Sequence, residues 1–216
     1  MTLTPDRIAT DFLRIADAMQ VETFSYYGYS WLALIGLQLA IRTNRLESLI
    51  MGGFPPYKGP YKEMMTVTAK TNAQALDNQT VTEDRMDDPA PTEASDWDNV
   101  QVKMDPGQTK QFFKLYQHLL DFDDTAIHGQ LRFPKLAFAG EKDKIVYGEN
   151  FGNVTVDMFG ILTANAHRLK QFGWDVVILR GDGMDHTKAM QPESVLPLIK
   201  PWLLDKLSRD SADGLR

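Results

Sequence analysis

Three side chains with complementary chemistry follow three predicted strands of this 216-residue chain. Ser30 comes after a short aromatic run, Asp143 after a buried apolar run, and His186 in a glycine-rich loop behind a β-branched run. The carboxyl ends of parallel strands meet at one edge of a sheet, so we expect the three groups to lie together there. A histidine can take the proton of a serine, and a carboxylate can fix the tautomer of the histidine. The predicted chemistry is therefore acyl transfer.

The candidate nucleophile lies in the sequence GYSWL, residues 28–32. Gly-x-Ser is a nucleophile signature where it occupies a sharp turn between a strand and a helix. The full signature has a second glycine two residues after the serine, where this chain has Leu32, and we expect this leucine to crowd the turn. In the alternative interpretation, Ser30 is only the N-cap of the helix that follows.

His186 is the strongest histidine candidate, because it alone of the four histidines lies in a predicted strand-end loop. The helical patterns contain His118 and His167. The sequence offers more than one candidate for the carboxylate that orients His186. Glu141 and Asp157 compete with Asp143 for the role of orienting His186. The neighbouring acids Asp182 and Asp185 fit polar groups of the histidine loop better than the acid of a triad.

The apolar patterns alternate between strand and helix. Aromatic, aliphatic and β-branched runs predict strands, and a 3.6-residue apolar period predicts helices. The predicted strands are residues 22–27, 46–51, 135–140 and 174–179. The main predicted helices are residues 31–42, 154–172 and 192–208, the last interrupted at Pro197 and Pro201, and a first helix is predicted to begin after Thr4 as its N-cap. This alternation predicts an α/β fold with a mostly parallel sheet and helices on both faces.

Residues 54–130 interrupt that alternation with polar, helix-leaning sequence. We interpret them as an insertion into a core formed by residues 1–53 and 131–216. The aromatic residues around the insertion could line an apolar substrate pocket next to the serine, or could simply pack the insertion against the core. These candidate pocket residues are Tyr29, Phe54, Tyr57, Tyr61 and His128.

The composition excludes several classes of function. The net charge is −6 and lysines and arginines do not cluster, so we expect no nucleic-acid partner. The chain has no cysteine for a disulfide or a thiolate metal site, and we expect no metal. The polar N-terminus does not resemble a signal peptide, and the longest apolar run is too short to span a bilayer. We therefore expect a cytoplasmic protein that acts on a small molecule, without a membrane partner.

Together these residues resemble the α/β-hydrolase family of the serine-nucleophile type. The chain order Ser30, Asp143, His186 matches that family. The segment LAFAGEKDKIV resembles its acid-bearing strand end, and GDGMDHTKAMQPESVLPLIKPWL resembles its histidine loop and last helix. The resemblance covers essentially the whole chain and implies that residues 54–130 form a helical cap. It also implies that Trp31 donates its backbone N–H to an oxyanion hole, that no cofactor is needed, and that the substrate is an ester or has a related acyl or carbon–carbon bond.

The resemblance implies an N-terminally truncated member. In this family further strands, and a loop with a second oxyanion donor, precede the nucleophile, whereas only one predicted helix precedes the first strand here. Without such strands the first strand has an open edge, which favours association, for example as a homodimer. Three interpretations stay open: a piece of a longer enzyme, a sheet completed by a partner, or a non-enzymatic hydrolase-like domain that acts through association.

Overall fold

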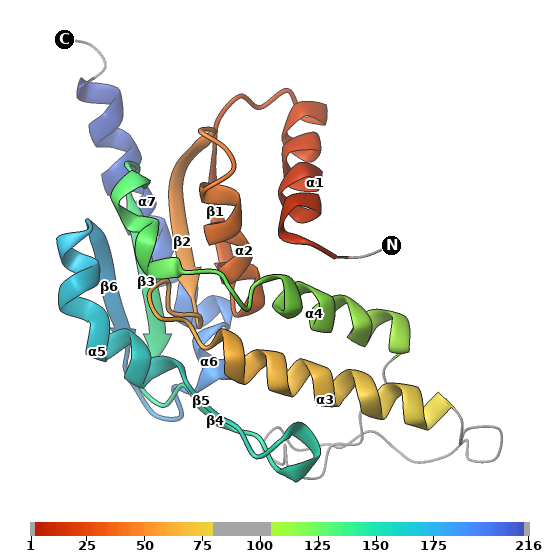
Figure 1. Cartoon of the computed structure of the whole chain (residues 1–216). Coiled ribbons are helices and arrows are strands. Elements are labelled where there is room, and N and C mark those ends of the chain that lie inside the picture. Colours follow the sequence, from red (N-terminus) through yellow and green to blue (C-terminus); the bar gives the residue numbers. More distant parts are fainter. Residues whose placement is uncertain (1–2, 80–104, 214–216) are drawn as a thin grey trace. The chain divides into compact units, whose positions relative to one another are not determined.

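The computed structural model describes residues 3–79 and 105–213, and it contains a four-stranded parallel sheet (Figure 1). The strands lie in the order β1-β2-β3-β6. Their bounds are β1 Phe24–Tyr29, β2 Leu46–Gly52, β3 Lys135–Gly140 and β6 Trp174–Leu179. The last two agree with the predicted bounds, and β1 begins and ends two residues later than predicted. The α/β fold with a mostly parallel sheet is confirmed.

Helices pack on both faces of this sheet because neighbouring strand residues point to opposite sides. On one face, Gly36 of α2 (Trp31–Ala40) lies against the side chains of Tyr26 and Leu49. On the other face, Val195 and Ile199 of α7 (Pro192–Asp213) form a core cluster with residues of β2 and β3. Helix α2 is apolar all round and is buried from Ala33 to Ala40, as expected for a helix enclosed on most sides.

Helix α7 is continuous across Pro197 and Pro201, where the sequence predicted interruptions. Each proline removes a backbone donor from the helix. Tertiary packing compensates, because one side of α7 is buried against the sheet and the indole of Trp202 donates a 2.7 Å hydrogen bond to Asp175 of β6. Lys206 adds an ion pair to the same carboxylate.

Further helices and 3₁₀ turns accompany the sheet. Helix α1 (Pro5–Ala18) begins after Thr4, whose hydroxyl accepts the backbone N–H of Arg7 as predicted for an N-cap. The others are α5 (Met158–Gln171), α6 (His186–Ala189) and the 3₁₀ turns η1 (Asp124–Ala126) and η2 (His128–Gln130). No helix in the described parts of the chain is both long and apolar enough to cross a membrane.

A second compact unit comprises residues 60–122, 145–156 and the N-terminal residues up to Arg7. It contains α3 (Tyr61–Gln79), α4 (Pro106–His118) and η3 (Glu149–Phe151). Val67 of α3 and Phe151 of η3 form its small core cluster. A two-stranded ribbon, β4 (Lys144–Val146) and β5 (Thr155–Asp157), was not predicted. Residues 80–104 of the predicted cap lie outside the described residues. That residues 54–130 act as a cap stays a prediction.

The outer edge of β1 pairs with none of the strands in the described residues. The backbone N–H groups of Phe24 and Ser30 donate toward β2, so those of Ser25, Tyr27 and Tyr29 point the other way. Such an edge offers unpaired backbone groups to another chain. The homodimer through this edge stays a prediction.

Candidate active site

Ser30 occupies a sharp turn between β1 and α2. Its backbone has φ 56° and ψ −128°, a conformation that residues with a side chain rarely adopt. The turn is held by hydrogen bonds from Ser30 N–H to the Gly52 carbonyl, at 2.8 Å, and from Ala33 N–H to the Ser30 carbonyl, at 2.9 Å. The Ser30 side chain makes no capping hydrogen bond to α2. Ser30 thus occupies the N-cap position of α2 without capping it through its side chain. A strained serine between a strand and a helix has the geometry of a nucleophile elbow.

Gly28 permits this turn because the first turn of α2 folds back onto it. A Cβ at Gly28 would lie 2.3 Å from the carbonyl oxygen of Leu32, closer than any real contact. The side chain of Leu32 is 38% exposed, so it does not crowd the turn as the sequence suggested. The close backbone approach therefore occurs at Gly28, two residues before Ser30. Leu32, two residues after Ser30, takes part in it through its backbone carbonyl. That carbonyl also accepts a 2.9 Å hydrogen bond from the Tyr26 hydroxyl.

Asp143 and His186 form a hydrogen-bonded pair at the carboxyl ends of β3 and β6. His186 Nδ1 lies 2.8 Å from Asp143 Oδ1. Asp143 is fully buried, whereas the His186 side chain is 19% exposed. A buried carboxylate on Nδ1 holds the proton there and leaves Nε2 of the imidazole to act as a base. Residues 43 positions apart in the sequence are thus arranged as an acid–base pair.

The loop that carries His186 is fixed against the end of β3. Lys142 N–H donates a 2.9 Å hydrogen bond to the carbonyl of Met184. A Cβ at Gly140 would lie 2.3 Å from that same carbonyl oxygen, so only glycine allows the approach. The sequence contains Gly140 but gives no sign that a loop more than 40 residues later packs onto it.

The competing acids have other partners. Glu141 accepts the backbone N–H of Gly181 at 2.9 Å and pairs with Arg180, and Asp157 caps α5 through the N–H of Gly160. Asp185 caps α6 by accepting the N–H of Lys188. These contacts leave Asp143 as the carboxylate bound to His186.

Tyr29, the residue before Ser30, connects the serine turn to the histidine loop. Its hydroxyl donates a 2.8 Å hydrogen bond to the backbone carbonyl of His186, and its ring lies 5.1 Å from the imidazole. Burial is the main cause that raises the pKa of Tyr29, and the nearby Asp143 carboxylate raises it further. Sequence reasoning placed Tyr29 in the substrate pocket and missed these contacts, for which a separation of 157 residues leaves no local signal.

The other predicted pocket residues have varied surroundings. Phe54 is buried, with 2% exposure. The ring of Tyr61 lies edge-on to Phe122 within the helical unit. The ring of Tyr57 lies 5.4 Å from the ring of His128. Trp31 opens α2 directly after Ser30, as the prediction of its N–H as an oxyanion donor requires.

His128 lies in an aromatic cluster. It is 2% exposed, its ring stacks on Phe172 at 5.1 Å, and its Nδ1 accepts a 3.0 Å hydrogen bond from the indole of Trp174. Trp174 is the first residue of β6, whereas His186 follows the last. The enclosed position of His128 fits packing better than the substrate contact that the sequence suggested.

The burial of His128 predicts an acid-sensitive fold. Burial lowers the pKa of His128 to about 4, and the charge of Lys135 adds to this, while the backbone of Pro56 acts in the opposite direction. The unfolded chain, with a histidine pKa of about 6.5, then binds the proton more tightly than the folded chain. Stability is complete above that pH and falls as the pH drops toward 4, by up to about 3 kcal/mol.

Urea unfolding between pH 4 and pH 7.5 measures this dependence, and His128→Gln removes the titrating group. We expect a flatter pH profile for His128→Gln than for the wild type. His167→Gln is the control, because His167 is exposed in α5. If the free energy of unfolding changed equally with pH in the wild type and in His128→Gln, the prediction would be contradicted.

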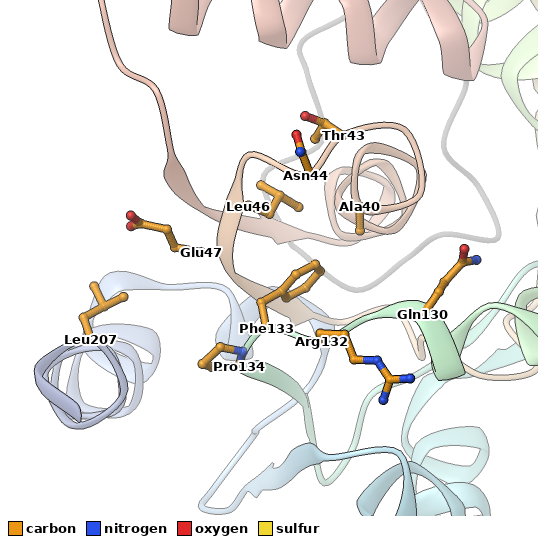
Figure 2. A pocket seen from close by; sticks show the side chains of 10 residues that line it. All are labelled: Ala40, Thr43, Asn44, Leu46, Glu47, Gln130, Arg132, Phe133, Pro134 and Leu207. Carbon is orange, nitrogen blue, oxygen red and sulfur yellow. The ribbon is translucent and has the colours of Figure 1, made fainter. Parts of the chain in front are cut away.

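A pocket of about 840 Å³ lies at the amino ends of β2 and β3 (Figure 2). It is lined by Ala40, Thr43, Asn44, Leu46, Glu47, Gln130, Arg132, Phe133, Pro134 and Leu207. Ligands of open parallel sheets bind at the carboxyl ends of the strands, where Ser30, Asp143 and His186 lie. This pocket therefore does not belong to the candidate active site.

Comparison with known proteins identifies the fold. No protein-family model matches the sequence, and no curated protein matches it. Solved structures do match. A carboxylesterase from Nitrososphaera gargenis has a TM-score of 0.63 at 14% identity, over 96% of this chain and 74% of its own.

Two further solved structures are similar to this chain. An α/β hydrolase from a Medee basin deep-sea metagenome library gives a TM-score of 0.61 at 10% identity, over 94% of this chain and 73% of its own. An esterase from Exiguobacterium antarcticum gives a TM-score of 0.56 at 16% identity, over 92% of this chain and 74% of its own. With the parallel sheet, the strained serine turn and the strand-end histidine already described, these similarities show that this chain has the α/β-hydrolase fold.

Proposed function

We propose that this protein is a serine hydrolase that cleaves an ester, or a related acyl or carbon–carbon bond, of a small molecule. Ser30 is the nucleophile, His186 the general base and then the general acid, and Asp143 the residue that orients His186. The observation that carries the proposal is the 2.8 Å contact between His186 Nδ1 and the buried Asp143 carboxylate, at the sheet edge where Ser30 also lies.

The proposed reaction begins when His186 takes the hydroxyl proton of Ser30 as the oxygen attacks the carbonyl carbon. The positive charge that develops on the imidazole faces the Asp143 carboxylate, which stabilises it. His186 then gives the proton to the leaving group, and water releases the acyl group from Ser30 by the same steps. We predict that the Trp31 N–H binds the oxyanion and that Tyr29, Phe54 and Tyr57 border an apolar substrate.

A fluorophosphonate probe tests this proposal, because it reacts only with a serine that a neighbouring base activates. We expect labelling of the wild type, with peptide mapping that locates the adduct at Ser30, and none of Ser30→Ala. Ser25→Ala is the matched control, because Ser25 is an exposed serine of β1, the strand that leads into Ser30. A folded wild-type protein that is not labelled would contradict the proposal.

A second candidate is a hydrolase-like domain that acts through association. It is favoured by the outer edge of β1, which has no strand partner among the described residues. Exposed apolar side chains occur on β1 and on its flanking segments: Ile15, Met19, Val21, Tyr27 and Leu32. The same labelling experiment separates the two candidates, since association alone needs no activated serine.

A further inference from the structure

Tyr29 joins the two halves of the candidate site through its backbone and its side chain. Its backbone ends β1 and leads directly into the strained turn at Ser30. Its hydroxyl donates to the carbonyl of His186 at 2.8 Å, and its ring lies 5.1 Å from the imidazole. A shift of Tyr29 would therefore move both the nucleophile turn and the general base.

The position of the Tyr29 ring is determined by the sheet beneath it. Tyr29 is in register with Gly52, and Gly52 with Phe138, so the three residues form a row across β1, β2 and β3. The absent side chain at Gly52 lets the other two rings meet at 5.9 Å, because a Cβ there would lie 2.4 Å from Phe138 and 2.5 Å from Tyr29. The hydroxyl is thus presented by a rigid element.

Tyr29 and Asp143 contact the same histidine, Tyr29 at the backbone carbonyl of His186 and Asp143 at its Nδ1. Burial is the largest cause that raises the pKa of Tyr29, and the charge of the Asp143 carboxylate raises it further. Asp143 Oδ1 is bound to His186, whereas the buried Oδ2 has no hydrogen-bond partner within the described residues. A phenol has a single hydrogen to donate, and in the structure the Tyr29 hydroxyl donates it to the His186 carbonyl.

We propose that Tyr29 is a positioning residue, whose hydroxyl anchors the backbone of His186 and so holds the imidazole on Asp143 next to the Ser30 turn. The inference rests on the proposed function for its catalytic consequence. It concerns the resting protein, however, and can be measured there.

The test compares Tyr29→Phe with Tyr27→Phe. Tyr29→Phe keeps the ring and removes the donor. Tyr27→Phe is the matched control, because Tyr27 lies two residues earlier on the same face, also stacks near Phe138, and is 41% exposed. The readout is the NMR signal of the His186 Nδ1 proton and its rate of exchange with solvent. A residue that contributes only to overall stability would not change this signal.

We expect exchange of the His186 Nδ1 proton to be about tenfold faster in Tyr29→Phe, as for the loss of one hydrogen bond, and unchanged in Tyr27→Phe. Labelling of Ser30 by the fluorophosphonate should slow by a similar factor. Incorporation of 3-fluorotyrosine at position 29 keeps the ring and makes the hydroxyl a stronger donor, so it should slow the exchange. It provides the test if Tyr29→Phe does not fold.

The outcomes distinguish this inference from the proposed function. An exchange rate in Tyr29→Phe equal to that of the wild type would overturn the positioning role, whether or not Ser30 is labelled. Faster exchange in Tyr29→Phe supports the positioning role. If the wild type is then not labelled, the hydrolase proposal fails while the role of Tyr29 stands.

Discussion

Asp143→Asn is expected to lower kcat by about 10⁴-fold while the protein stays folded. The amide has the shape of the carboxylate, but its N–H₂ group donates where Asp143 Oδ1 now accepts, 2.8 Å from His186 Nδ1. The imidazole proton then moves to Nε2, and a protonated Nε2 cannot take a proton from Ser30. The carboxylate that would stabilise the charged imidazole is lost as well.

The measurement is the rate of ester hydrolysis, or of Ser30 labelling where no ester is turned over, together with a thermal melt. Asp182→Asn is the matched control, because Asp182 lies in the same loop as His186 and accepts a hydrogen bond from Lys188 through its backbone carbonyl, which the substitution keeps. A rate for Asp143→Asn within tenfold of the wild type would rule out Asp143 as the orienting acid.

Gly28→Ala is expected to destabilise the protein by about 3 kcal/mol or more, as overpacking against rigid atoms does. The added Cβ would lie 2.3 Å from the Leu32 carbonyl oxygen and 2.7 Å from the Ala33 nitrogen. Both atoms belong to the backbone of the first turn of α2, so no side-chain rotation relieves the clash. Because domains are stable by only about 5–15 kcal/mol, a large part of the stability would be lost.

Urea unfolding followed by circular dichroism gives the free energy of unfolding. Gly129→Ala is the matched control, because a Cβ at Gly129 meets nothing within 4 Å. We expect that variant to stay within about 0.5 kcal/mol of the wild type. Labelling of Ser30 should decline in Gly28→Ala even under conditions where it remains folded, since the turn must open. Equal stability of the two alanine variants would contradict the predicted close approach.

The strands could be predicted well because their signals are local. The runs KLAFAG at residues 135–140 and WDVVIL at 174–179 are short and rich in aliphatic or β-branched residues, and the structure has both strands at those bounds. Helix α7 was predicted less well. The prolines at 197 and 201 indicated interruptions, but burial of Val195 and Ile199 against the sheet holds one continuous helix.

The ribbon β4–β5 and the environment of His128 could not be predicted. Each strand of the ribbon has only three residues, too few for a period to be recognised. His128 is buried because Phe172 and Trp174, more than 40 residues later, close around it. A histidine in a polar stretch gives no sign of such a contact.

The sequence by itself determined which groups follow the strands: Ser30 behind β1, Asp143 behind β3 and His186 behind β6. It could do so because a strand, its end and the residue after it are consecutive in the chain. Only the tertiary structure decided that Asp143 rather than Glu141 contacts His186, and that the Tyr29 hydroxyl reaches the His186 carbonyl. These contacts depend on strand order and register, which join residues 43 to 157 positions apart. The periodicity of a single chain carries no information at that distance, because the packing of the whole sheet determines which side chains meet.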